Sequence, residues 1–203
     1  MKLVFVCSGN TCRSPMAECV LEYLLKKEGI EGIEVSSRGV VANVGADTSE
    51  NAKKALEAKG IPVKKHVATQ MTTQEVFQND LVICMTERHK MRLGSLPKVF
   101  TLHQLTGCGD IVDPFGGDEE VYKKCLDELI AAITKLLPIL KRQLALEPPK
   151  APETKPHVKH ETKPKAKPET KTKPKAKPQA KKPAKKPAEE EKSAAEEKKA
   201  SEE

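Results

Sequence analysis

The segment from Leu3 to Leu25 constrains the fold more than any other part of the chain. The apolar run Leu3-Val4-Phe5-Val6 predicts a strand that is buried on both faces. Ser14-Pro15 then combines a good helix N-cap with proline at the first helical position. Residues 7–13 are therefore expected to form a loop between a strand and a helix. The expected helix carries apolar residues at a spacing that places them on one stripe: Met16, Ala17, Val20, Leu21, Leu24 and Leu25.

The loop Cys7-Ser8-Gly9-Asn10-Thr11-Cys12-Arg13 has the composition of an anion-binding site. Backbone N–H groups and the helix dipole favour an anion at a helix N-terminus. A thiol in that place, beside a cation, has a lowered pKa and is present as a nucleophilic thiolate. We therefore expect Cys7 to be the nucleophile. The planar guanidinium of Arg13 can hold two oxygens of a phosphoryl group.

Three further residues fit the same loop. Gly9 allows the backbone to close around an oxyanion, and Asn10 tolerates left-handed backbone geometry. The hydroxyl of Ser14 can donate a hydrogen bond to the Cys7 thiolate. Cys-x5-Arg alone is a loose pattern, but a preceding strand and a following capped helix make it a strong one.

Strand-like and helix-like segments alternate along the rest of the first 100 residues. This alternation predicts an α/β three-layer sandwich with a central four-stranded parallel sheet and helices on both faces. Ligands of such sheets bind at the carboxyl ends of the strands, where Cys7 falls. The expected strands are 33–35, 81–85 and 98–101, with 63–67 as a strand or an extended connection, and the expected helices are 48–59, 73–78 and 86–93.

The last part of the expected domain combines a loop with a long helix. Residues 106–117 contain four glycines and Asp113, which indicates a loop. An apolar stripe then predicts a helix over 118–146, and Pro138 inside it should kink or interrupt that helix.

Composition separates residues 1–146 from residues 147–203. The first part is nearly balanced in charge and long enough to bury a core, so we assign it as one domain. The second part contains 17 Lys, 11 Asp or Glu and 10 of the 15 prolines, without Leu, Ile, Phe, Met or Tyr. We expect it to be a disordered tail because it has almost nothing to bury. Its basic part, 150–187, either contacts a polyanion such as nucleic acid or is a solvated spacer.

The apolar runs of the sequence are too short to span a membrane, and the N-terminal run stops at Cys7 without a cleavage-type region. A cytoplasmic location is the simplest expectation. In that location the six cysteines are expected to be free thiols rather than disulfides. The lack of paired CxxC motifs argues against a zinc site.

The segment from Val6 to Glu18 resembles the phosphate-binding loop of the low-molecular-weight protein-tyrosine-phosphatase family. Within that family it is most similar to the bacterial protein-arginine phosphatases. The resemblance covers roughly residues 1–145 and includes Asp113-Pro114-Phe115-Gly116-Gly117. It implies a cysteine-dependent phosphoprotein phosphatase that acts on phosphorylated proteins through a phosphocysteine intermediate.

The resemblance also implies a role for each site residue. Cys7 attacks phosphorus, Arg13 holds the transition-state charge, and Asp113 protonates the leaving group and then helps water to attack. Neither a cofactor nor a metal is required, because the loop itself supplies positive charge. The residues expected to bind substrate are Ser8, Gly9, Asn10, Thr11, Cys12, Ser14 and Phe115.

A small number of residues indicate whether the substrate is phosphoarginine or phosphotyrosine. Threonine at position 11 is typical of the arginine-specific branch, whereas tyrosine-specific members have a branched apolar residue there. Phe115 offers a ring face to a planar cation, and the aliphatic wall 40–45 lacks a ring that would stack on phosphotyrosine. We therefore expect a phosphoarginine substrate, with phosphotyrosine as the alternative.

Other interpretations stay open or are less favoured. In the family, a cysteine at the position of Cys12 can form a reversible disulfide with the nucleophile. Arsenate reduction is disfavoured because Cys84 has no cysteine a few residues away. His66 and His89 lack a recognisable partner spacing and are expected to be structural. Glu18 is expected to be a solvated or ion-paired surface group.

Overall fold

The structure is a computed structural model that describes residues 1–94 and 96–146 of the 203. All of these residues belong to the first of the two units into which the chain divides, Met1–Glu153. The expected tail, 147–203, lies outside the described residues.

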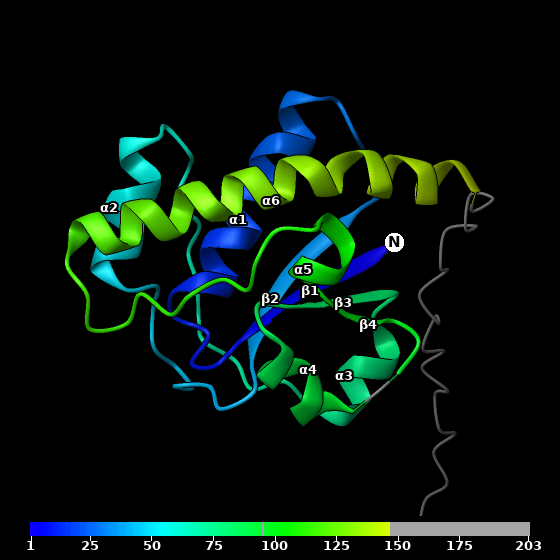
Figure 1. Cartoon of the computed structure of the whole chain (residues 1–203), viewed down its shortest axis with the longest axis horizontal. Coiled ribbons are helices and arrows are strands. Elements are labelled where there is room, and N and C mark those ends of the chain that lie inside the picture. Colours follow the sequence, from blue (N-terminus) through cyan, green and yellow to red (C-terminus); the bar gives the residue numbers. More distant parts are fainter. Residues whose placement is uncertain (95, 147–203) are drawn as a thin grey trace, which may run out of the picture. The chain divides into compact units, whose positions relative to one another are not determined.

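Four parallel strands form the central sheet, as the sequence predicts (Figure 1). They are β1 (Lys2–Cys7), β2 (Glu34–Gly39), β3 (Leu81–Cys84) and β4 (Val99–Thr101). Their order is β2-β1-β3-β4, so β1 is paired on both sides, with Cys7 opposite Gly39 of β2 and Val6 opposite Cys84 of β3. The end of β1 therefore lies where the chain crosses from one half of the sheet to the other, which is the usual ligand position in such sheets.

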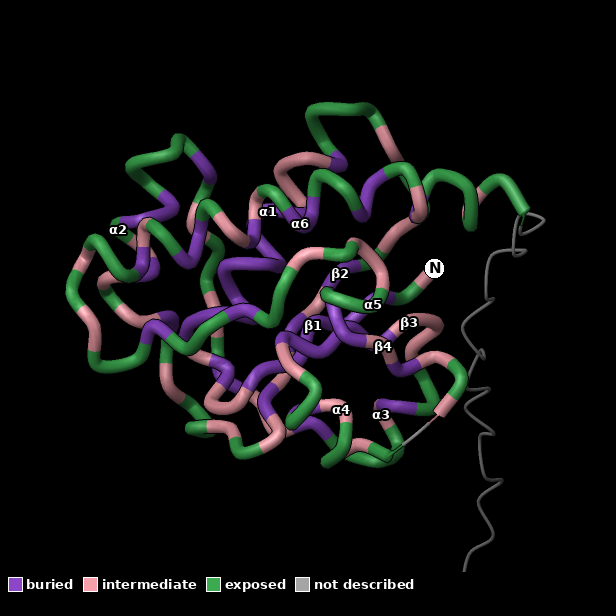
Figure 2. The backbone as a smooth tube through the Cα atoms, in the orientation of Figure 1, coloured by how far each residue is buried: buried purple, intermediate pink, exposed green. Residues whose placement is uncertain are grey.

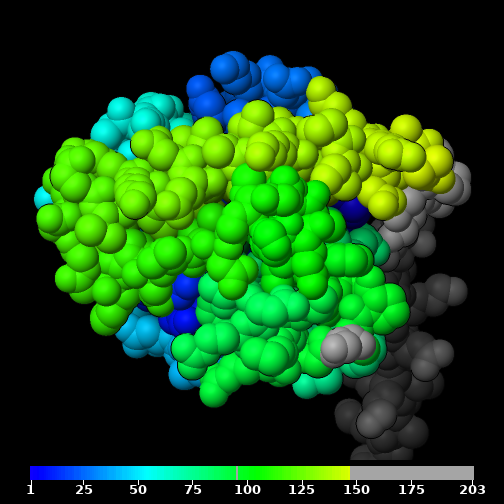
Figure 3. All heavy atoms as spheres, in the orientation of Figure 1, coloured from blue at the N-terminus to red at the C-terminus, as the bar shows by residue number. Residues whose placement is uncertain are grey.

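Helices cover both faces of the sheet, which confirms the three-layer α/β architecture. One face packs against α1 (Arg13–Lys27), α2 (Glu50–Ala58), α5 (Leu102–Thr106) and α6 (Glu119–Leu146). The other face packs against α3 (Thr73–Gln78) and α4 (Glu87–Leu93). In the space-filling view the yellow-green atoms of α6 form a band across the upper part of this face (Figure 3). Blue atoms from the N-terminal part of the chain show above this band, and the darkest blue atoms show only in small openings below it.

Alternation of side chains along β1 supplies both layers of the core. Leu3 and Phe5 face the α1–α6 side, whereas Val4 and Val6 face the α3–α4 side, and all four are fully buried. Figure 2 shows this buried strand at the centre of the sheet, with exposed residues on the outer turns of the helices. Each large apolar side chain buried in this way contributes about 1.5–3 kcal/mol.

Several boundaries differ from those that the sequence predicts. Helix α1 begins at Arg13 with Cys12 in the cap position, two residues earlier than expected. Ser14 does not cap the helix because its hydroxyl hydrogen-bonds within the loop instead. Helix α6 continues through Pro138 without interruption, and residues 63–67 form an extended connection rather than a strand. Helix α5, which Thr101 caps, is missing from the sequence prediction.

Within residues 1–94 and 96–146, none of the helices is both long enough and apolar enough to cross a lipid bilayer.

Candidate active site

A cavity of about 440 Å³ opens at the carboxyl end of β1. Its walls come from the β1–α1 loop, from the loop after β2 and from the segment that precedes α6. Residues 100 positions apart therefore meet at one site. It is lined by Cys7, Ser8, Gly9, Thr11, Cys12, Arg13, Val41, Asn43, Asp113 and Phe115.

The three residues that the sequence predicts to be catalytic, Cys7, Arg13 and Asp113, all line this cavity. So do five of the seven expected substrate-binding residues. Asn10 and Ser14 do not line it, because both side chains are fully buried behind the loop. Their position indicates that they support the loop rather than touch a ligand.

The Cys7 sulfur is surrounded by groups that stabilise a thiolate. Its Sγ lies 3.0 Å from the Ser14 hydroxyl and accepts a hydrogen bond of 3.3 Å from the Asn10 backbone N–H. Burial nevertheless raises the pKa of the Cys7 thiol, and the hydrogen bonds from Ser14 and Asn10 and the charge of Arg13 oppose this shift. The expectation of a lowered pKa is therefore not met, because desolvation of the sulfur outweighs its stabilising contacts.

Arg13 links the loop to the segment before α6. It is buried, and its guanidinium donates to the Ile111 carbonyl at 3.2 Å, to the Ser8 hydroxyl at 3.2 Å and to the Asp113 carboxylate. Its Nε is buried and has no hydrogen-bond partner among the residues that the structure describes. A buried donor without a partner is uncommon in proteins, so this N–H is suited to an anion in the cavity.

Asp113 reaches the cavity from the opposite side. Its side chain is 46% exposed and forms an ion pair with Arg13. The segment is anchored just before it, because the buried Ile111 donates its N–H to the Met85 carbonyl after β3. The fold, rather than the local sequence, thus brings this carboxylate to the cavity that Cys7 lines.

Asn10 holds the loop in shape. Its backbone φ of 58° is the one positive value at a non-glycine residue in the described part of the chain. Its side-chain amide donates to the hydroxyls of Ser14 and Ser37 at 3.0 and 3.1 Å, and its oxygen accepts the Thr69 N–H at 2.8 Å. The structure therefore places the left-handed residue of the loop at Asn10 and not at Gly9.

A chain of polar groups leads from Asn10 to the surface. Ser37 donates to Glu18 at 2.6 Å, and Glu18 forms an ion pair of 2.8 Å with Lys64. Only 8% of Glu18 is exposed. The expected ion pair of Glu18 is therefore confirmed, but the expected surface position is wrong because the residue is buried. Its carboxylate supports the loop through Ser37.

His66 and His89, the two histidines considered in the sequence analysis, both contact the β1–α1 loop. His66 donates from Nε2 to the Asn10 carbonyl at 2.7 Å, and Nε2 of His89 lies 2.9 Å from the Ser8 hydroxyl. Burial and the nearby Arg13 charge lower the pKa of His89 to about 4, so this ring is neutral at pH 7. Sequence spacing gives no signal for these contacts, because the partners lie 56 and 81 positions apart.

Cys12 faces a different set of groups from Cys7. Its Sγ lies 3.2 Å from the Tyr122 hydroxyl and 3.4 Å from the Ser49 hydroxyl. Burial and the contact with Cys12 raise the pKa of Tyr122 to about 12. Both cysteines are free thiols in this structure, and a Cys7–Cys12 disulfide stays a prediction.

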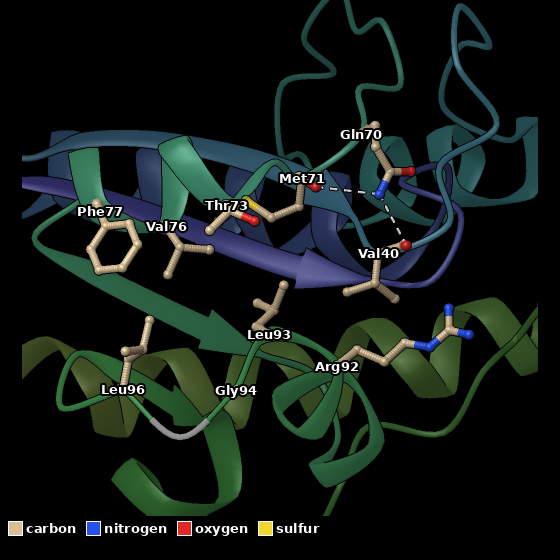
Figure 4. Close-up of a pocket in the computed structure, with 10 residues that line it drawn as sticks. All are labelled: Val40, Gln70, Met71, Thr73, Val76, Phe77, Arg92, Leu93, Gly94 and Leu96. Carbon is tan, nitrogen blue, oxygen red and sulfur yellow. Dashed lines mark hydrogen bonds between the residues drawn. The ribbon is translucent and has the colours of Figure 1, made fainter.

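A second cavity, of about 530 Å³, lies between α3 and α4 on the other face of the sheet (Figure 4). It is larger than the cavity at Cys7, but its lining is mainly aliphatic and lacks a nucleophile or a carboxylate. Size is therefore a poor guide to the reactive site in this molecule. The lining comprises Val40, Gln70, Met71, Thr73, Val76, Phe77, Arg92, Leu93, Gly94 and Leu96.

A sulfur nucleophile, an anion-holding arginine loop and a carboxylate across the cavity are the parts of a cysteine-dependent phosphatase. Comparison with known proteins gives the same class. The sequence model of the family described as "Low molecular weight phosphotyrosine protein phosphatase" matches residues 2–146. The chain belongs to this family.

Two curated relatives resemble the chain closely and over nearly their whole length. The protein-arginine-phosphatase of Bacillus subtilis is 40% identical over 149 residues, which are 70% of this chain and 98% of the relative. The low-molecular-weight protein-tyrosine-phosphatase PtpB of Staphylococcus haemolyticus is 35% identical and covers 67% of this chain and 97% of its own.

Solved structures of the same family share the fold. A YwlE arginine phosphatase, a C7S mutant with a phosphorylated active-site serine, is 39% identical with a TM-score of 0.67. It covers 72% of this chain and 100% of its own. YwlE from Geobacillus stearothermophilus is also 39% identical, with a TM-score of 0.64, and covers 74% of this chain and 99% of its own.

Proposed function

We propose that this phosphatase removes phosphate from phosphorylated arginine side chains of proteins, with Cys7, Arg13 and Asp113 as its catalytic residues. The observation that carries the proposal is the meeting of these three residues in one cavity. The arginine preference is supported by relatives named protein-arginine-phosphatases at 40% and 42% identity.

In the first step Cys7, having released its thiol proton to solvent, attacks phosphorus as the thiolate. An S–P bond forms and the P–N bond to the guanidine breaks, while Asp113, in its protonated form, gives a proton to the departing nitrogen. Backbone N–H groups of the loop and the Arg13 guanidinium hold the charge on the phosphoryl oxygens. The orphaned Arg13 Nε–H supports this assignment, because it has no competing protein partner in the described residues.

In the second step water attacks the phosphocysteine. Asp113, now ionised, takes a proton from that water, the S–P bond breaks, and inorganic phosphate and the Cys7 thiolate are released. Ser14 and Asn10 stabilise the departing thiolate through their hydrogen bonds to Sγ. The YwlE C7S mutant with a phosphorylated active-site serine supports a covalent intermediate at this position.

Three residues that line the cavity would set the preference for arginine. Thr11 gives a slimmer and more polar wall than a branched apolar residue, and its hydroxyl can orient the attacking water. Asp113 can also pair with the guanidinium of the substrate, which a phenol does not allow. Phe115 is 78% exposed at the rim, where its ring face can contact a planar cation.

Phosphotyrosine is the second candidate substrate. Relatives at 32% and 35% identity are named protein-tyrosine-phosphatases. The exposed ring of Phe115 can also stack on a phenol ring.

The deciding experiment compares kcat/KM on a phosphoarginine peptide and on the matched phosphotyrosine peptide. We expect phosphoarginine to be preferred, and a preference for phosphotyrosine would overturn the arginine assignment. Cys7→Ser removes the nucleophile and should lower turnover of both peptides by about 10⁴-fold or more. Residual turnover within tenfold of the wild type would refute the role of Cys7.

We also propose that residues 1–146 form the catalytic domain and that the enzyme is cytoplasmic. The Lys-rich segment 150–187 supports a further proposal, polyanion contact through its charges alone. Such binding should fall steeply with salt and should be lost from the variant truncated at Glu147. Salt-insensitive binding would count against it.

A further inference from the structure

A third cavity, of about 330 Å³, adjoins the one at Cys7. The two cavities share four lining residues, so a group bound in one lies beside a group bound in the other. The far wall of the third cavity belongs to α4. The lining residues are Ser8, Arg13, Val40, Val41, Thr86, Arg88, His89, Arg92 and Asp113.

The charges of this cavity do not cancel. Arg13 and Asp113 form an ion pair, and His89 is neutral at pH 7 because its pKa is lowered to about 4. Arg88 and Arg92 are therefore the two lining residues whose positive charge no other lining residue neutralises. Both are exposed, and neither side chain forms an ion pair or a hydrogen bond with any residue of 1–94 or 96–146. They are four positions apart on α4, so they project from the same side of the helix.

The acidic residues nearby are engaged elsewhere. Asp110 accepts the backbone N–H of Glu87 at 3.3 Å, and the Glu87 carboxylate accepts a hydrogen bond from Gln104 at 3.3 Å. Neither carboxylate lines the cavity. The wall formed by α4 is therefore cationic.

Figure 4 shows the direction of Arg92. Its guanidinium extends away from Phe77 and Leu96, which lie at the apolar end of the α3–α4 cavity. It lies toward the end that Val40 occupies, and Val40 also lines the cationic cavity. The charged end of Arg92 is thus not part of the apolar lining.

We propose that Arg88 and Arg92 form a subsite for a carboxylate side chain that flanks the phosphorylated residue of the substrate protein. This inference rests on the phosphatase function proposed above and adds a sequence preference to it. Two guanidinium groups can each bind a carboxylate through paired N–H donors. Neighbouring Cα atoms of a polypeptide are 3.80 Å apart, so a side chain one or two positions from the phosphorylated residue reaches the adjoining cavity.

The test uses four peptides. Glu or Gln flanks either phosphoarginine or phosphotyrosine, and the readout is the Glu-to-Gln ratio of kcat/KM within each pair. Partly exposed charge pairs are worth little individually, so we expect a ratio of about two to ten for the wild type at low salt. At ionic strengths of about 0.5 M the ratio should approach one because salt screens exposed charges.

Two variants separate the subsite from general charge effects. Arg88→Gln/Arg92→Gln should bring the ratio close to one. Lys90→Gln removes a charge from the same helix, but Lys90 contacts Gln104 and does not line the cavity, so the wild-type ratio should persist.

Three outcomes would overturn the proposal of a carboxylate subsite. The Glu-to-Gln ratio of kcat/KM could be near one for the wild type, it could keep its wild-type value in the double variant, or it could fall equally in Lys90→Gln. A failure of the proposed preference for phosphoarginine can be told apart from a failure of the subsite. In that case the phosphotyrosine pair would be the better substrates, and the ratio within that pair would still decide the role of Arg88 and Arg92.

Discussion

The two loops that meet at the active site differ most in how they are held. In the β1–α1 loop, Cys7, Asn10, Cys12 and Arg13 are buried and hydrogen-bonded to other elements. In the segment 107–118, most residues are exposed, and only Ile111 and Pro114 are buried. The loop proposed to hold the phosphoryl charge is thus preorganised, whereas the segment proposed to supply the acid and to meet the substrate is anchored at few points.

This contrast predicts that changes in the two loops affect different properties. Substitutions in the buried loop should lower the free energy of unfolding as well as activity. Substitutions in the exposed segment should change catalysis or preference and leave stability nearly unchanged.

The largest effect is expected from Asp113→Asn. Removing the general acid should lower kcat by about 10²–10⁴-fold, most strongly for substrates with poor leaving groups. Because the side chain is half exposed, the melting temperature should move by only a few degrees. Steady-state kinetics on aryl phosphates of increasing leaving-group pKa would check this, and equal turnover across the series would refute the role.

Asn10→Ala tests the preorganised loop. It removes three hydrogen bonds, of which two are buried and one is partly buried, and places alanine at a left-handed φ of 58°. We expect a loss of about 2–4 kcal/mol in the free energy of unfolding, measured by urea denaturation. Asn43→Ala is the matched control, because Asn43 lines the cavity at Cys7 but is exposed. Equal stability of the two variants would contradict the contrast between the loops.

Ser14→Ala tests the environment of the nucleophile. Since burial raises the pKa of Cys7 and Ser14 opposes that shift, losing the hydroxyl should raise the pKa further. At a fixed pH below this pKa, less thiolate is present, so alkylation of Cys7 by iodoacetamide should slow by about tenfold. The wild-type rate should keep climbing with pH above 9, the ordinary value for a thiol. Glutathione is the reference thiol, and faster alkylation of the variant would be the opposite of this prediction.

The smallest effect is expected from Thr11→Ile. The larger apolar side chain should shift the ratio of kcat/KM from phosphoarginine toward phosphotyrosine by about tenfold. Val41→Ile, at another residue that lines the cavity, adds bulk without removing a hydroxyl and serves as the control. An unchanged ratio in Thr11→Ile would remove Thr11 from the determinants of substrate preference.

The sequence predicts the layers of the fold because its apolar runs are local signals. The runs at 3–6 and 81–84 become central strands, and the helices expected at 73–78 and 86–93 form with boundaries within one residue of the prediction. The nucleophile and the arginine are also local, since one short loop carries both. The position of Asp113 follows only from the family resemblance, because the structure brings it to Arg13 across 100 residues.

Other features of the site have no local signal. The contacts of His66, His89 and Tyr122 with the loop depend on side chains that come together only when the sheet and helices pack. The direction of the Cys7 pKa shift likewise depends on how completely the sulfur is desolvated. The sequence motif indicates which groups stabilise the thiolate, but it does not indicate how deeply the sulfur is buried.

The central position of β1 has a consequence for folding kinetics. This strand pairs with β2 on one side and, across nearly 80 residues of intervening chain, with β3 on the other. Contacts of such long sequence separation form slowly, and the Arg13–Asp113 pair closes an even longer loop. After dilution from denaturant, the circular dichroism signal of the helices should therefore recover before enzymatic activity. The return of turnover would then show that the long-range contacts between β1 and β3 and between Arg13 and Asp113 have formed.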